Sequence, residues 1–131
     1  MAAPTLADIL AGKSEAHRVL HSPGGTRFIV LNAIEAFNSQ WVENGTLYST
    51  DDNTILVQFG EWQWHVDRVV WNGEDRLELQ MRRYPGDAPG LVLRVDLAVR
   101  LAHTSTDNQT IPLDELTGWL ELWYQINRQR R

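Results

Sequence analysis

The chain has 131 residues, of which 12 are basic and 17 are acidic, and it contains no cysteine. The acidic balance makes a nucleic acid a poor partner, because neutralising phosphates requires a basic surface. The lack of cysteine excludes disulfides and thiolate metal sites, and it favours a reducing, cytoplasmic location. No signal-peptide pattern and no long apolar run is present, so we expect no membrane contact. The length predicts one domain over residues 1–131.

Residues 6–20 carry the pattern of an amphipathic helix. Thr5 is a suitable N-cap, and Asp8 follows three residues later in an acidic variant of the capping box. Apolar residues fall close to one face, namely Leu6, Ile9, Leu10, Ala16, Val19 and Leu20. The Ser-Pro-Gly-Gly stretch that follows predicts the end of this first helix.

A second helix is predicted over residues 27–43. Val30, Ile34, Phe37 and Trp41 recur at alternating spacings of four and three, which is the spacing of a helical stripe. The alternative is a strand over 28–31, where the residue types favour β structure. The longer period favours the helix.

From residue 46 onward the apolar period changes to two, which is typical of strands. Five strands are expected, at 46–50, 54–59, 62–71, 76–84 and 91–101. Strict alternation in the last of them indicates an antiparallel strand with one buried face. A long loop is expected over 103–110, which is rich in Thr, Ser, Asp and Asn.

The dipeptide Asn72-Gly73 is the clearest turn signal of the chain. It supplies the positive φ angles of a two-residue type I′ hairpin loop. Such a loop would place Val66 opposite Leu79, with the apolar residues of both strands on one face. A slip of one residue would put them on opposite faces. We therefore predict this hairpin and this register.

Residues 113–127 predict a final helix. Pro112 suits its first turn, and the acidic Asp114 and Glu115 suit the positive end of the helix dipole. Gly118 interrupts the helix at a cost of about 1 kcal/mol relative to alanine, which the close approach of another backbone would explain. The apolar arc is wider than a single sheet requires. It comprises Leu113, Leu116, Trp119, Leu120, Leu122, Trp123 and Ile126.

The order of these elements defines an α+β fold. We expect two layers: a four- to five-stranded antiparallel meander sheet, with two N-terminal helices and one long C-terminal helix.

The predicted hairpin register brings three ionisable side chains together: His65, Asp67 and Glu78. Asp67 and Glu78 would stand directly opposite, where like charges destabilise a sheet. Diagonal pairing with Arg76, Arg82 or His65 would offset this repulsion, and so would a cation bound by the three side chains. The two carboxylates could also form a catalytic pair, since each shifts the pKa of the other. We favour a solvated face with ion pairs, without a metal or a cofactor.

Two further patterns were compared with known ligand sites. His17 and His21 lie four residues apart on the first predicted helix, but the glutamate of the zinc-protease motif is missing between them. Gly24 and Gly25 precede the second predicted helix and could hold an anion there, but they lack the lysine and the strand of a phosphate loop. We expect two solvent-side histidines and a helix-breaking loop.

Six tryptophans exceed what one small core needs. Aromatic residues anchor protein interfaces and line apolar pockets. The candidate binding residues are therefore Trp41, Trp71, Trp119 and Trp123. On the last helix we expect Trp119 to face outward and Trp123 to be part of the core.

These observations favour a non-enzymatic, intracellular protein-binding domain, such as a bacterial adaptor, chaperone or assembly factor. Its partner would be another protein or a second copy of the chain, and not a nucleic acid or a membrane. The alternative is a small domain or enzyme that binds an apolar ligand between the sheet and the last helix. Trp62, Trp64, Met81 and Trp123 would line that pocket.

Overall fold

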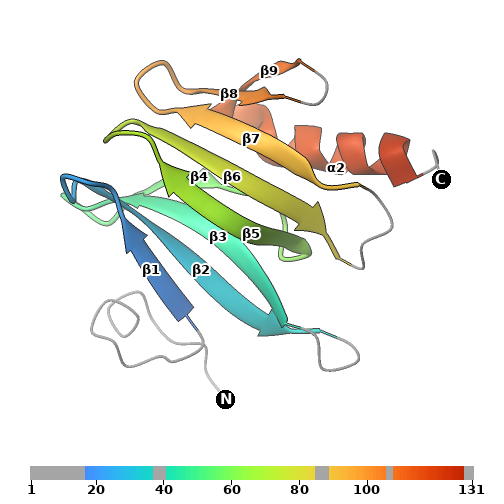
Figure 1. The fold of residues 1–131 in the computed structure, drawn as a ribbon, viewed down its shortest axis with the longest axis horizontal. Helices are drawn as coiled ribbons and strands as arrows, with labels where there is room; N and C mark the ends of the chain where they lie inside the picture. The colour runs from blue at the N-terminus through green and yellow to red at the C-terminus, as the bar shows by residue number, and fades with distance from the viewer. Residues whose placement is uncertain (1–16, 37–40, 85–88, 106–107, 129–131) are drawn as a thin grey trace.

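The computed structural model describes residues 17–36, 41–84, 89–105 and 108–128, which form two antiparallel sheets and a C-terminal helix (Figure 1). Sheet A contains, in spatial order, β1 (His17–His21), β2 (Arg27–Glu35), β3 (Trp41–Ser49) and β4 (Ile55–Gln58). Sheet B contains β5 (Trp64–Trp71), β6 (Arg76–Arg83), β7 (Leu91–Asp96), β8 (Leu101–Thr104) and β9 (Thr110–Pro112). A single 3₁₀ turn, η2 (Leu113–Glu115), leads into helix α2 (Leu116–Asn127). Each sheet is a meander, and the last helix is where the sequence predicts it.

The expected α+β fold with two N-terminal helices is wrong for the described residues. The stretch predicted as the second helix forms β2 and the first residues of β3, while its residues 37–40, among them Phe37, lie outside the described residues. Of the first predicted helix, residues 6–16 lie outside the described residues, and the remainder lies in β1. The four consecutive residues 28–31 are each at most 4% exposed, so this part of β2 is buried on both faces. A doubly buried strand lacks the period of two, and its apolar run can match a helical spacing by coincidence.

The strand expected over 91–101 is broken in two. β7 ends at Asp96, whose carboxylate accepts a hydrogen bond from the N–H of Ala98 at 3.0 Å. This is the local turn that aspartate favours. Arg100 has a φ of 56° in the same turn, and Val99 is 60% exposed although it continues the apolar alternation. The loop expected over 103–110 is shorter, because its first two residues belong to β8 and its last begins β9, which pairs with β8.

The β5–β6 hairpin forms, but the predicted register is wrong. Val66 pairs with Met81 and not with Leu79. The turn is longer than two residues, because the N–H of Asn72 donates a hydrogen bond to the carbonyl oxygen of Arg76 at 2.8 Å. A longer turn shifts the pairing of the whole hairpin.

A β-bulge at Asp67 keeps the apolar side chains of β5 on the core. Trp64 and Val66 are buried on one side of the bulge, and Val69 and Trp71 pack against the core on the other. The bulge inserts one residue, so the alternation slips at this point. The spacing of three between Val66 and Val69 is the signal that the sequence carries for it.

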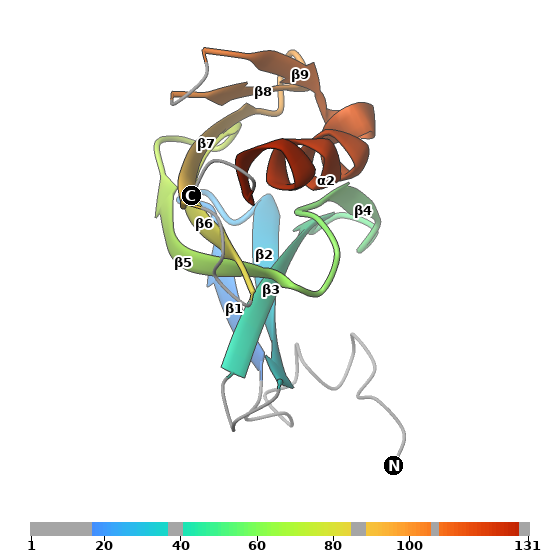
Figure 2. The same ribbon diagram turned by 90° about the vertical axis from the view of Figure 1, so that its right-hand side faces the viewer.

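The two sheets share one core where β3 passes β5. Gly45 lies at this crossing, and a Cβ there would stand 3.2–3.3 Å from the side chains of Ile29, Phe59 and Val66. The glycine therefore allows the two sheets to pack closely. Figure 2 shows α2 between β8 and β9 on one side and β4 on the other. The core comprises residues of both sheets and of α2, with the fully buried Trp64 near its centre.

Candidate functional site

The structure brings together only two of the three residues proposed as a catalytic or metal-binding group. His65 Nε2 lies 3.3 Å from Asp67 Oδ1. Glu78 instead forms an ion pair with Arg94 of the neighbouring strand, at 3.1 Å. The bulge and the longer turn remove the predicted pairing of the two carboxylates, so the expected like-charge contact does not occur.

His65 joins the two sheets through Nδ1 and contacts Asp67 of its own strand through Nε2. Nδ1 accepts a hydrogen bond from the N–H of Glu43 at 2.9 Å, and a neutral ring then carries its proton on Nε2, facing Asp67. β4 pairs with β3 only from Thr46 to Tyr48, so the N–H of Glu43 lies beyond the end of β4 and needs another partner. No ring nitrogen is left to take a proton from a substrate. The arrangement explains His65 as a structural residue.

Arg82 neutralises the carboxylate of Asp67. Two guanidinium nitrogens donate to the two carboxylate oxygens at 2.7 and 2.8 Å. This hydrogen bonding lowers the pKa of Asp67 and raises the pKa of Arg82. A bidentate arginine thus supplies the positive charge for which the sequence suggested either an ion pair or a cation.

The loop between β1 and β2 does hold an anion, and that anion is the side chain of Glu74. Its carboxylate accepts hydrogen bonds from the hydroxyl groups of Ser22 and Thr26 and from the N–H groups of Gly24 and Thr26. These bonds, led by the Thr26 hydroxyl, lower the pKa of Glu74 from 4.5 to about 2. We call this contact the Glu74 clasp. It joins the turn of the β5–β6 hairpin in sheet B to sheet A.

A second polar cluster attaches α2 to sheet B. The carboxylate of Glu121 accepts a hydrogen bond from the indole N–H of Trp64 at 3.2 Å and forms an ion pair with Arg83 at 3.2 Å. The Arg83 guanidinium lies 4.0 Å from the centre of the Tyr124 ring. Sequence reasoning missed this cluster, because its members are distant in the chain and no local pattern marks them.

A groove of about 530 Å³ lies on the face of sheet B that is turned away from α2. Its side chains include the cross-strand ion pairs Arg94–Glu78 and Arg76–Asp96, at 3.1 and 3.4 Å, and His103. Each arginine is balanced by one carboxylate. Such alternating pairs are what stabilises the solvated face of an antiparallel sheet. The groove therefore has no net charge that would favour an anionic or a cationic ligand.

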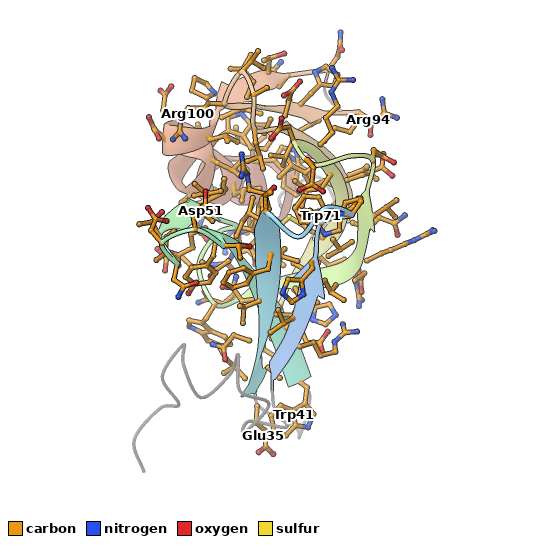
Figure 3. The ribbon with its side chains drawn as sticks, turned by 90° about the vertical axis from the view of Figure 1, so that its left-hand side faces the viewer. Glu35, Trp41, Asp51, Trp71, Arg94 and Arg100 are labelled. Carbon is orange, nitrogen blue, oxygen red and sulfur yellow. The ribbon has the colours of Figure 1, made fainter. Side chains whose placement is uncertain are left out.

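The four tryptophans proposed for binding lie in different environments. Trp41 is 56% exposed at the end of the β2–β3 hairpin, far from Trp71 (Figure 3). Trp71 and Trp119 are partly buried and pack against the core, and Trp123 is buried. They do not form one surface. Trp123 lies in the core, as the helical pattern predicts.

The outer face of α2 carries the exposed apolar residues that the tryptophan argument missed. Leu122 is 60% exposed and Ile126 is 48% exposed, one helical turn apart. Gly118 lies one turn before Leu122 and is exposed as well. We call Gly118, Leu122 and Ile126 the outer stripe. Their spacing of four places them in one row on the helix surface, and the breadth of the predicted apolar arc was the signal for it.

His17 and His21 lie on strand β1 and not on a helix. Four residues of strand separate their Cα atoms by roughly 13 Å, so the helical spacing that suggested a shared metal ion does not apply. Among the described residues, no group of three or more histidine and carboxylate side chains is arranged to hold a metal ion.

No helix in the described ranges is long and apolar enough to cross a membrane. Comparisons with family models, with curated proteins and with solved structures gave no match. The function therefore has to be argued from the geometry.

Proposed function

We propose that the chain is a non-enzymatic protein-binding domain, and that its contact surface is the outer stripe of α2. The observation that carries this proposal is the exposure of Leu122 and Ile126 on a helix whose opposite face is part of the core. A helix that only covers a sheet needs an apolar arc of about 100°. Apolar side chains beyond that arc contribute favourable free energy only when a partner removes them from water.

The partner surface that fits this row is another helix with an apolar face. An amphipathic helix binds its partner through apolar side chains one helical turn apart, which is how the outer stripe is spaced. Figure 2 shows one side of α2 free of other described elements, so a helix could lie along it. The domain would then act as an adaptor or assembly factor, and the core beneath α2 would hold the stripe rigid.

The pocket-based alternative has less support. Trp64, Met81 and Trp123 are buried side chains that pack directly against other core residues. Trp62 is 39% exposed and lies against Tyr84, with a ring separation of 6.4 Å. Three of the four residues proposed to line an apolar pocket are thus part of the packed core, and the fourth lies outside it.

The experiment compares the wild-type chain with Leu122→Glu and Ile55→Glu. Ile55 is 61% exposed on β4, so its substitution places the same charge on an equally exposed apolar position elsewhere. Each immobilised chain is exposed to an extract of the source organism, and retained proteins are then purified and titrated calorimetrically. We expect a partner that binds wild type and Ile55→Glu but not Leu122→Glu. If no binding depends on Leu122, this proposal is wrong.

A further inference from the structure

Gly118 has no explanation within the part of the chain that the structure describes. It is the third residue of α2, and glycine within a helix is up to about 1 kcal/mol less favourable than alanine. Neither a turn nor a close contact requires it: its φ is not positive, and a Cβ built at this position would meet no described atom within 4 Å apart from its own stretch of helix. Because it belongs to the outer stripe, the space above it is open to another molecule.

The outer stripe complements itself. Gly118 and Ile126 lie at equal distances, one helical turn, on either side of Leu122. A two-fold axis through Leu122 would therefore place Ile126 of one copy over Gly118 of the other, and Leu122 over Leu122. The Ile126–Gly118 contact would then occur twice, once on each side of the axis, as an isologous interface requires. Rows of residues four apart are among the ridges through which helices pack against each other.

The charges at the two ends of the helix favour the same antiparallel arrangement. Two acidic residues precede α2: Asp114, which pairs with Arg100 of the same chain at 3.0 Å, and the exposed Glu115. Arg128 follows the helix. The sequence adds two further arginines at 130 and 131. An antiparallel pair brings the acidic end of each helix near the basic end of the other. The two helix dipoles then point in opposite directions, which is also favourable. A parallel pair would bring like charges together.

We propose that the partner of the outer stripe is a second copy of this chain, bound through antiparallel packing of the two α2 helices about an axis at Leu122. This inference rests on the proposed function and names the partner for it. Other protein helices are the alternative occupants that the tests below distinguish.

The first test is sedimentation velocity on the full chain over a range of concentrations. Wild type and Ile55→Glu should form a dimer, and Leu122→Glu should weaken the dimer on the order of tenfold or more, as for an interface anchor. Circular dichroism of each variant shows that it is folded. A wild-type chain that stays monomeric at every concentration would falsify the proposal, and so would equal effects of the two substitutions.

The second test fixes the register. The chain has no cysteine, so any disulfide comes from an introduced residue. Leu122→Cys should form a covalent dimer under mild oxidation, because each residue 122 meets its own copy. Ile126→Cys alone should not, whereas a mixture of Ile126→Cys and Gly118→Cys chains should cross-link. Equal cross-linking of an Ile55→Cys control would overturn this register.

The two proposals fail differently. A monomeric wild-type chain that still binds a purified partner through Leu122 removes self-association and leaves the protein-binding function standing. A monomeric chain without a Leu122-dependent partner removes both.

Discussion

The two faces of α2 differ in how much of their apolar surface is buried. The inner face contributes Leu116, Leu120 and Trp123 to the core, each at most 5% exposed. The outer face exposes Leu122 and Ile126 to solvent, together with Gly118 one turn before Leu122. The residue types on the two faces are similar, so composition alone does not tell them apart.

The difference teaches that burial, and not hydrophobicity, assigns a residue to the fold. An inner-face side chain stabilises the chain by itself, since its apolar area leaves water when the sheet and helix pack. An outer-face side chain adds nothing until a second surface covers it. Substitutions on the inner face should therefore alter unfolding, and those on the outer face should alter association.

The largest effect is expected for Trp123→Ala on the inner face. Removing a buried aromatic ring that packs against Trp64, with ring centres 6.1 Å apart, should lower the free energy of unfolding by about 3–5 kcal/mol. Urea unfolding followed by circular dichroism measures this. A loss below about 1 kcal/mol, typical of a surface site, would contradict the assignment of this face to the core.

Two leucines of the same helix give the sharpest form of the comparison. Leu120 is fully buried and Leu122 is 60% exposed. Leu120→Ala should destabilise the chain by about 2–5 kcal/mol, whereas Leu122→Ala should change the free energy of unfolding by less than about 0.5 kcal/mol. Both are measured by urea unfolding at a concentration where the chain is monomeric. Similar losses for the two leucines would mean that the faces are assigned incorrectly.

The sequence predicts this comparison only in part. The helical pattern correctly locates α2 and puts Trp123 in the core. The breadth of the apolar arc also indicates a second face. It does not identify which residue is outermost, because that depends on what lies beside the helix: Trp119 packs against the core and Leu122 does not.

The sheets show a similar limit. Most strands after residue 54 follow from a period of two, but β2 does not, because both of its faces are buried. The hairpin register depended on a longer turn and on the bulge at Asp67, which is marked only by one irregular spacing. From the sequence, a helix-breaking loop is expected at Gly24 and Gly25 in preference to an anion site, whereas the loop does bind a carboxylate. Its occupant, Glu74, lies about fifty residues away, where no local pattern could indicate it.

A smaller effect is expected at the Glu74 clasp, which tests a polar contact of the fold away from both faces of α2. The pKa of Glu74 in the fold is about 2, below its usual 4.5. A lowered pKa means that the clasp stabilises the fold above about pH 4.5 and that this contribution is lost as the pH falls toward about 2. Glu74→Gln should be less stable than wild type at pH 7, and the gap should close in acid. Unfolding curves measured from pH 7 to pH 2 check this, and a gap that does not change with pH would contradict it.

An effect of opposite sign is expected for Gly118→Ala. Alanine removes backbone freedom from the unfolded chain and meets no neighbour in the fold, so the monomer should gain up to about 1 kcal/mol of stability. The same methyl group would occupy the space that Ile126 of a second copy needs, so the dimer should weaken. Urea unfolding of the dilute chain measures the first change, and sedimentation measures the second. A less stable monomer would show that Gly118 has a role within the fold. A more stable monomer with unchanged association would show that no partner approaches the helix at this point. Only a more stable monomer together with a weaker dimer fits an outer stripe in which Gly118 leaves space for a side chain of the partner.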